Sequence, residues 1–365
     1  MANCTGKVLA GSLLAAAFAI SADARERVVH VYNWSEYVDP SVLEDFTRDT
    51  GIKVVYDTFD SNEMLETKLL TGGSGYDVVV STTSFLARQI KAGVFQKLDK
   101  SKLPNLVNMW DAISKRTAEF DPDNAYSVNY AWGTIGVGYN IDKVKAALGT
   151  DKIESWETVF NSDSMSKLAT CGVYMLDAPV SVISPTLKYL GKDPNDYSRE
   201  NLQRVEDLLM KIRPHIRKFA AGEFTNALAS GDACFGISAA GWVLQARSAA
   251  IEGGTGIKIG YAVMKEGTEV WFDQMAIPAD APDVAEAHEF IDYIMRPEVA
   301  AKITNKIRYA NGNKASQKFI LPEVLNDPAI YPGEEVMSKM FAVKPQDQQT
   351  QRLMNRMWTK VVTGQ

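Results

Sequence analysis

The sequence predicts an α/β protein of two domains, in which mostly parallel sheets are flanked by helices. The first hundred residues alternate strand and helix patterns, and the middle of the chain repeats that alternation. The chain has 365 residues, which is too many for one ordinary hydrophobic core. No internal repeat or low-complexity linker divides it. We therefore expect two α/β units joined directly by strands.

The first 24 residues have the pattern of a secretory signal. Lys7 supplies the positive charge, and residues 8–20 form an uncharged run of 13 residues, which is short for a membrane span. Residues 22–24 (Ala-Asp-Ala) match an A-x-A cleavage site, so the mature protein should begin at Arg25 and keep 341 residues. We expect an exported, periplasmic protein, since no second long apolar run follows.

Strands and helices alternate regularly over residues 27–93. Asp39 and Pro40 have the residue types of a helix N-cap and first helical position, and Gly51 ends that helix. Ser61 is suited to cap the next helix. Residues 76–80 are almost entirely apolar, which is typical of a parallel strand buried on both faces. The predicted strands are 27–32, 52–59 and 76–80, and the predicted helices are 39–51, 61–72 and 84–92.

The remaining elements follow the same reasoning. A glycine-rich segment at 134–139 is predicted as a strand, and Pro214 ends a long amphipathic helix. The predicted strands are 134–139, 171–176, 233–238, 256–264 and 270–277. The predicted helices are 143–148, 155–161, 185–190, 201–212, 224–230, 283–295, 297–307 and 348–362. The strands near 134–139 and 256–262 are candidates for hinge crossings between the two units.

Charge and motifs argue against several classes of function. The net charge is −6, whereas nucleic-acid binding requires a basic surface. The three histidines, His30, His215 and His288, match no metal-binding spacing, and the chain has no G-x-S-x-G elbow and no P-loop. We therefore expect no enzyme activity, no cofactor and no metal site, and a structural or solvated role for each histidine.

Aromatic, hydroxyl and acidic residues gather at the ends of predicted elements. Trp34, Ser35, Glu36 and Tyr37 follow the first strand, and ligands of open α/β sheets bind at the carboxyl ends of strands. Aromatic faces and a carboxylate suit a small cationic ligand. Further candidates of the same kind are Thr82, Trp242, Trp271, Asp273 and Tyr309.

The mature chain has two cysteines, Cys171 and Cys234, each in or beside a short apolar strand pattern. An even number of cysteines in an oxidising compartment favours a disulfide. Two separate buried thiols are the alternative that the sequence leaves open at this point.

Over almost its whole length the chain resembles the periplasmic putrescine/spermidine-binding proteins of ABC transporters. The resemblance rests on six stretches: YNWSEY at 32–37, TGIKVVYD at 50–57, AGVFQKLDKSKLP at 92–104, CGV…LDAP at 171–179, FD with PAD at 272–280, and YAN at 309–311. It implies two lobes joined by crossing strands, with a ligand cleft between them, and a monomer that docks on a membrane permease.

The resemblance also implies roles for individual residues. Trp34, Ser35, Glu36 and Tyr37 match ligand-contacting positions, with Glu36 at a position that is commonly Asp. Thr82 takes a hydroxyl position, Trp271 an aromatic position, Asp273 an amine-binding carboxylate and Tyr309 a phenol. Cys171 and Cys234 match the cysteine pair of the family. The implied lobes are 25–133 with 256–315, and 134–255 with 316–365.

Two carboxylates of the family pattern are missing. Val180 and Ser181 stand where the family carries acids, and Ala239 and Trp242 stand where it has Trp and Asp. Each lost charge-assisted hydrogen bond weakens binding by ~1.5–3 kcal/mol, and a cation–π contact from Trp242 returns ~0.5–2 kcal/mol. We include Ser181 and Trp242 among the candidate ligand residues, and the exact amine stays open.

The leading interpretation is a receptor that delivers a polyamine to an ABC importer. A second interpretation keeps the scaffold but binds a monoamine or ω-amino acid, whose carboxylate would meet Arg308. A third is a ligand-loaded sensor that docks on a membrane signalling protein. A diamine fits two acids, Glu36 and Asp273, better than spermidine does, unless Glu66, Asp177 or another acid also reaches the cleft.

Overall fold

The computed structural model describes residues 1–2, 26–220 and 222–365 of the chain. Apart from its first two residues, the predicted signal sequence lies outside the described residues, so its cleavage site at 22–24 stays a prediction. Within the described part, no helix is both long enough and apolar enough to cross a membrane.

One mixed sheet runs through the molecule, with the strand order β2-β1-β3-β9-β4-β7-β5-β6, and β8 pairs with β4 beside that path. Strands β1, β2 and β3 are parallel to one another, as are β5, β6 and β7, while β9 and β8 are antiparallel to their neighbours. The strands are β1 (Val28–Trp34), β2 (Lys53–Phe59), β3 (Val78–Thr82), β4 (Ser127–Asn140), β5 (Val173–Leu176), β6 (Lys218–Ala220), β7 (Phe235–Ala239), β8 (Ile259–Ala262) and β9 (Glu269–Ala276).

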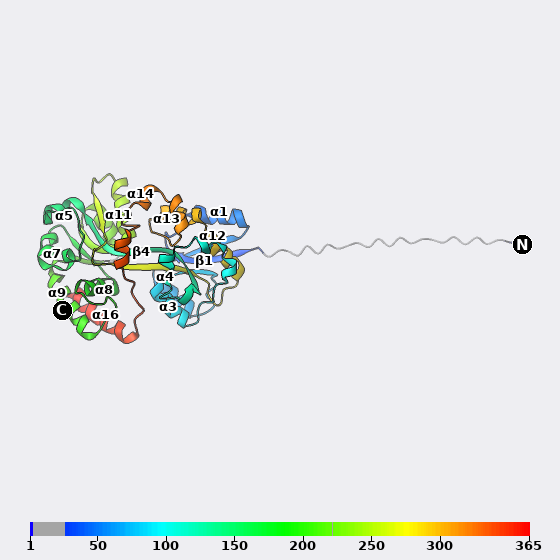
Figure 1. The fold of residues 1–365 in the computed structure, drawn as a ribbon, viewed down its shortest axis with the longest axis horizontal. Helices are drawn as coiled ribbons and strands as arrows, with labels where there is room; N and C mark the ends of the chain where they lie inside the picture. Colours follow the sequence, from blue (N-terminus) through cyan, green and yellow to red (C-terminus); the bar gives the residue numbers. More distant parts are fainter. Residues whose placement is uncertain (3–25, 221) are drawn as a thin grey trace.

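Helices cover the sheet on both of its faces (Figure 1). They are α1 (Pro40–Thr50), α2 (Asn62–Leu70), α3 (Thr83–Lys91), α4 (Asp111–Thr117), α5 (Ile141–Leu148), α6 (Glu157–Phe160), α7 (Ser162–Ala169), α8 (Pro179–Tyr189), α9 (Arg199–Ile212), α10 (Glu223–Ser230), α11 (Ala240–Glu252), α12 (Val284–Ile294), α13 (Pro297–Ile307), α14 (Pro322–Leu325), α15 (Glu334–Lys339) and α16 (Gln348–Thr363).

The predicted ends of the first helices are confirmed. The Asp39 side chain accepts a hydrogen bond from the Ser41 amide, Pro40 is the first residue of α1, and Gly51 ends the helix with φ of 71°. Ser61 caps α2 by accepting a hydrogen bond from the Met64 amide. These contacts satisfy backbone N–H groups that a helix terminus leaves without partners.

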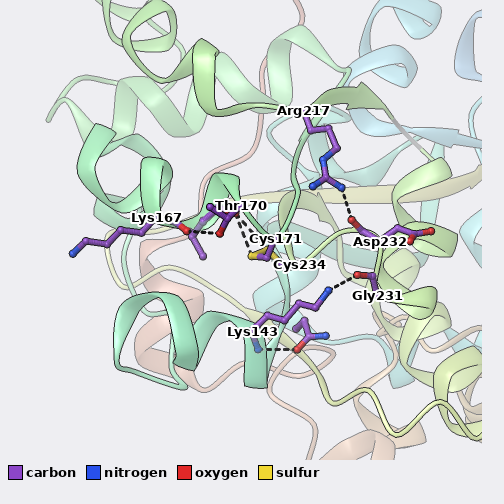
Figure 2. The surroundings of a disulfide bond; sticks show 10 residues. Lys143, Lys167, Thr170, Cys171, Arg217, Gly231, Asp232 and Cys234 are labelled. Carbon is purple, nitrogen blue, oxygen red and sulfur yellow. Dashed lines mark hydrogen bonds between the residues drawn. A yellow bond between two sulfur atoms is a disulfide. The ribbon is translucent and has the colours of Figure 1, made fainter.

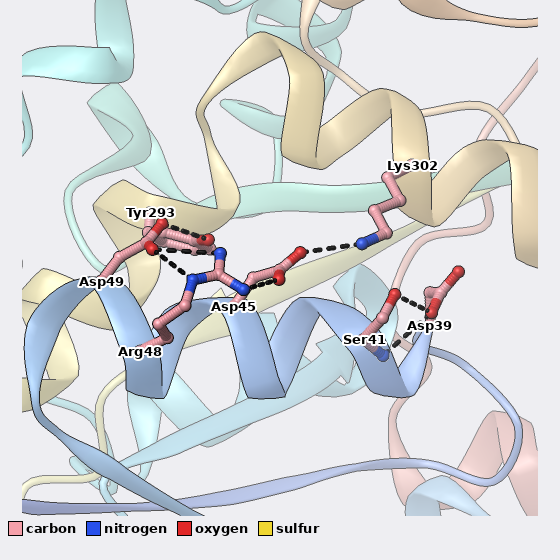
Figure 3. A network of polar contacts seen from close by, with 7 residues as sticks. All are labelled: Asp39, Ser41, Asp45, Arg48, Asp49, Tyr293 and Lys302. Carbon is pink, nitrogen blue, oxygen red and sulfur yellow. Dashed lines mark hydrogen bonds and ion pairs between the residues drawn. The ribbon is translucent and has the colours of Figure 1, made fainter.

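Polar and charged contacts hold helix α1 against α12 and α13 (Figure 3). Asp45 on α1 accepts a hydrogen bond of 2.8 Å from Lys302 on α13, and Asp49 accepts one of 3.2 Å from Tyr293 on α12. Phe46 of α1 packs against Phe290 of α12, with ring centroids 5.2 Å apart. Segments about 250 residues apart in sequence therefore belong to one packed unit.

Strand β4 joins the two halves of the molecule. It is longer than the predicted strand at 134–139, and all of its residues from Ser127 to Asn140 are buried. Its first part pairs with β9 and its last part with β7 and β8. In Figure 1, β4 runs through the middle, with β1 and α12 on one side and α5, α7 and α9 on the other.

Each half has its own core. One large cluster of buried side chains comes from residues 135–264 together with Met354, Met357, Trp358 and Val361 of α16. A second comes from residues 29–131 and 275–307. Helix α16 packs on α8 and α9, which places the C-terminus with the first of these cores (Figure 1).

Several helices differ from the sequence-based expectation. Helix α8 begins at Pro179 rather than Pro185, because Pro179 takes the first helical position and the helix continues through the second proline. Helices α4, α7, α11, α14 and α15 were not predicted. In α11 the apolar residues fall on all sides, so the sequence lacks the one-sided pattern of an amphipathic helix.

Cys171 and Cys234 form a disulfide with a Cα–Cα distance of 5.6 Å, as the cysteine count predicts. The two cysteines (Figure 2) lie in the segments that lead into β5 and β7. The Cys234 amide also donates a hydrogen bond of 2.9 Å to the Gly172 carbonyl. The two parallel strands are therefore fastened at their amino-terminal ends.

Candidate ligand-binding site

A cavity of about 230 Å³ lies where β1, β3 and β9 meet the first turn of α11. Nine of the ten predicted ligand residues line it, and Ser181 does not. The lining residues are Trp34, Ser35, Glu36, Tyr37, Thr82, Ala239, Trp242, Gln245, Trp271, Asp273, Ile307 and Tyr309. None of these residues carries a positive charge, and the two charged ones, Glu36 and Asp273, are acids.

Asp273 is a buried carboxylate held on both oxygens. The Tyr37 hydroxyl donates to Oδ2 at 2.9 Å, and the Thr82 hydroxyl donates to Oδ1 at 2.6 Å. The residue exposes 4% of its surface, and this burial raises its pKa to about 6, although the two hydrogen bonds lower it. The carboxyl group is therefore oriented in advance, and a cation in the cavity would stabilise its charged form.

Aromatic rings form the walls beside this acid. Tyr309 lies edge-on to Trp271 with ring centroids 5.0 Å apart, and edge-on to Tyr37 at 5.7 Å. The Trp271 ring lies over Gly133 of β4, where an added Cβ would be 2.4 Å from Trp271 Cζ2. Only glycine at 133 allows this ring position. The walls suit both the methylenes and the ammonium groups of an amine.

The turn after β1 forms the rim. Glu36 is exposed and takes a left-handed conformation with φ of 55°, which a non-glycine residue rarely adopts. The Ser35 hydroxyl donates to Asp60 at 2.7 Å. Trp34 packs against Phe59, and its buried indole nitrogen Nε1 has no hydrogen-bond partner among the described residues.

The sequence-based reasoning missed three lining residues, which are Ala239, Gln245 and Ile307. Ala239 caps α11, and Trp242 and Gln245 follow on that helix, three residues apart and hence on one face. A prediction of α11 would have identified Gln245 by its spacing from Trp242. Ile307 is the last residue of α13, immediately before Arg308 and Tyr309, and its apolar character alone gave no signal.

Ser181 is placed differently from the prediction. Because α8 starts at Pro179, Ser181 lies in its first turn, and α8 packs on β9. The Ser181 hydroxyl interacts with the carboxylate of Glu269 at the start of β9, and neither residue is among those that line the cavity. Val180 packs against the core of the same half.

The other charged residues that the sequence suggested as ligand contacts either have partners within the protein or lie outside the cavity. Glu66 accepts two hydrogen bonds from Arg88, at 2.5 and 2.8 Å. Asp177 accepts one of 2.8 Å from the Trp358 indole. Arg308 is the left-handed C-cap of α13 and is absent from the cavity lining. The donor proposed for a ligand carboxylate is therefore not in place.

The histidines have structural contacts. His288 Nε2 accepts a hydrogen bond of 2.9 Å from the Asp99 amide, and His215 lies 3.2 Å from the Ser162 hydroxyl. His30 lies 3.3 Å from Asp77, close to Asp283. Both oxygens of Asp77 accept backbone amides, from His30 and Asp283. This cluster ties β1 to the start of α12.

A two-lobed α/β fold with a small acidic and aromatic cavity is typical of solute receptors. The chain belongs to the bacterial extracellular solute-binding proteins, whose family model matches residues 41–332.

The chain is 46% identical to the putrescine-binding periplasmic protein SpuD of Pseudomonas aeruginosa, over 98% of each chain. It is 45% identical to the putrescine-binding periplasmic protein PotF of Escherichia coli, over 98% of this chain and 97% of that protein.

A solved structure supports the fold. The spermidine/putrescine ABC transporter substrate-binding protein PotD of Streptococcus pneumoniae matches with a TM-score of 0.83 and 26% identity. The match covers 93% of this chain and 99% of that one. The predicted two-lobed α/β fold class and the family resemblance are thereby confirmed.

Proposed function

We propose that this protein is a periplasmic receptor that binds a putrescine-type diamine and delivers it to the permease of an ABC importer. The observation that carries the proposal is Asp273, a buried carboxylate between aromatic walls in a cavity without cationic residues. An ammonium there gains a charge-assisted hydrogen bond, and its methylenes gain contact with the rings. The names of the two relatives that share about 45% of its residues support putrescine as the ligand.

The proposed lobes are residues 25–133 with 256–315, and residues 134–255 with 316–365. The two buried clusters at 29–131 with 275–307 and at 135–264 with 354–361 support this division for most of the chain. Ala262 and Met264 pack with the second lobe, however, and residues 320–330 pack with Trp132 of the first. The mature protein begins at Arg25 and acts as a monomer, and the lobes close over the ligand about β4 and the segment near 252–258. Delivery then depends on the permease recognising the closed form.

A thermal-shift screen tests the ligand class. The mature protein is heated with putrescine, cadaverine, spermidine, γ-aminobutyrate and 5-aminovalerate, each at several concentrations. A bound ligand stabilises the folded state by about 2.7 kcal/mol at 100 times its Kd. We expect the largest shift with putrescine. Shifts with none of the five compounds would contradict the proposal.

A second candidate ligand is an ω-amino acid, because two features of the cavity favour an acceptor group. The Trp34 indole N–H has no partner among the described residues, and α11 begins at the cavity with its N-cap Ala239. Helix N-termini attract carboxylates. The absence of Arg308 from the lining weighs against this candidate, and the same screen separates the two.

A further inference from the structure

Glu269, the first residue of β9, is a buried acid that the site described above does not use. It exposes 8% of its surface, and its Oε2 atom has no hydrogen-bond partner in the described chain. A buried carboxylate oxygen without a partner is costly for the folded state. This oxygen is therefore free to accept a hydrogen bond from a donor outside the described chain.

The strand register places Glu269 on the face of the sheet that forms the cavity floor. Side chains at 269, 271 and 273 point to the same side of β9, because alternate residues of a strand share a face. Trp271 and Asp273 line the cavity. Ile135 of β4 pairs with Glu269 on one side and with the cavity residue Ala239 on the other. Glu269 therefore lies beyond Trp271, at the end opposite Asp273, next to the residues that line the cavity but not among them.

The spacing of the two acids matches a diamine. Four residues of an extended strand span ~13 Å. This span joins the two Cα atoms; if the side chains stand parallel on the strand, two ammonium–carboxylate contacts of ~2.8 Å each would leave ~7 Å between the nitrogens. The nitrogens of extended putrescine are ~6 Å apart, since each bond of a staggered chain advances it by roughly 1.25 Å. Trp271 lies midway between the acids, where the carbon chain would pass.

The surroundings of Glu269 suit a cationic partner. Burial raises its pKa to about 7, and the Ser181 hydroxyl of α8 lowers it again. Ser181 and Val180 occupy the positions where the family resemblance implies acids. In this chain the carboxylate beside that first turn of α8 comes instead from Glu269 on β9. A neighbouring ammonium would restore the charged form of the carboxyl group.

We propose that Glu269 is the second ammonium anchor, so that a diamine lies along β9 between Asp273 and Glu269 with its methylenes over Trp271. This inference rests on the proposed function and assigns the far end of its ligand. It predicts a site built for two ammonium groups at a fixed separation.

Calorimetry with two probes that share a four-carbon chain tests the proposal. Putrescine carries two ammonium groups, and butylamine has the same carbon chain with one. We expect Glu269→Gln to weaken putrescine about 10- to 100-fold, the worth of one charge-assisted hydrogen bond, and to leave butylamine within about twofold. Glu269→Asp keeps the charge and should retain part of the putrescine affinity. Glu63→Gln, an exposed acid on α2, is the control.

The calorimetric results distinguish a ligand anchor from a structural residue at position 269. Equal losses for both probes would make Glu269 a structural residue, and unchanged putrescine affinity in a folded Glu269→Gln protein would overturn the assignment. If that variant does not fold, a wild-type protein that binds both probes equally overturns it. Binding of neither probe by the wild type would instead refute the proposed function.

Discussion

The Asp273 carboxyl group is the best-organised polar group of the cavity. Tyr37 and Thr82 each donate to one of its oxygens, and Asn62 in turn donates to the Thr82 hydroxyl at 3.1 Å. A carboxylate can accept about four hydrogen bonds, so capacity remains for a ligand ammonium. This chain of contacts fixes the acid before the ligand arrives and lowers the cost of ordering it on binding.

Asp273→Asn should weaken putrescine binding by about 1.5–3 kcal/mol, because it keeps the shape of the side chain and removes its charge. Calorimetry on the folded variant measures the loss. Glu36→Gln is the matched comparison, and we expect a smaller effect because Glu36 is exposed at the rim. An affinity for putrescine within twofold of the parent in Asp273→Asn would remove this residue from the role of anchor.

Affinity for an amine should rise with pH between about 5 and 8. Burial raises the pKa of Asp273 to about 6 and that of Glu269 to about 7 in the ligand-free protein. The bound cation favours the charged carboxylates, so binding releases protons in this window. Calorimetry in two buffers of different ionisation enthalpy measures the release. No dependence on buffer at pH 6 would contradict it.

The same two groups act on stability with the opposite sign. Their pKa values are higher in the folded than in the unfolded chain, so the ligand-free native state binds more protons between about pH 4 and 7. Their contribution to the stability of the ligand-free protein therefore falls as the pH rises through that range. Saturating ligand should remove this fall.

At the scale of elements, the disulfide fastens β5 to β7 on the far side from the cavity. Cys234 precedes β7, whereas Ala239 at the other end of that strand lines the cavity. The bond closes a loop with a sequence separation of 63 residues. Its effect should therefore be on stability rather than on binding.

The double variant Cys171→Ala with Cys234→Ala should lose about 2–4 kcal/mol of unfolding free energy, since the open chain gains freedom mainly in the unfolded state. Urea unfolding measures the loss, and putrescine affinity should stay within twofold. Thiol labelling of the denatured, unreduced mature protein should find no free thiol. Two free thiols per chain would show that the bond does not form.

Most elements could be predicted because their ends carry local signals. Asp39, Ser61 and Gly51 set helix limits through contacts within a few residues. The cavity residues on β1, β3 and β9 could likewise be predicted, because strand ends gather at one edge of the sheet. The turn of α8 over β9 and the helix after β7 depend on packing between distant segments. Ser181 was therefore predicted at the cavity although it does not line it, and Gln245 lines the cavity but was not predicted.

Glu269 shows why the site itself was harder to predict than the fold. In sequence it is one acid among 45 acidic residues, at the start of a strand. Only the pairing of β4 with both β9 and β7 places it on the cavity face, next to α8. Charge counting from the sequence alone consequently omitted it.

At the scale of the molecule, the cavity lies between parts that we assign to different lobes. Tyr309 follows α13, and Gly241 belongs to α11, yet a Cβ added at Gly241 would lie 2.1 Å from the Tyr309 hydroxyl. Such close contact indicates a closed arrangement. Small-angle scattering should give a larger radius of gyration without putrescine than with it. The same radius at saturation would argue against hinge closure, though not against binding.

The central claim is that the cavity is built to bind a diamine. Calorimetry of the mature protein with putrescine and with γ-aminobutyrate tests it most directly. The end groups of γ-aminobutyrate are separated by three methylenes, one fewer than in putrescine. We expect one putrescine per chain, bound at least about tenfold more tightly than γ-aminobutyrate, because one of the two acids loses its ammonium partner and faces a carboxylate instead. Heat from γ-aminobutyrate with none from putrescine would contradict the claim.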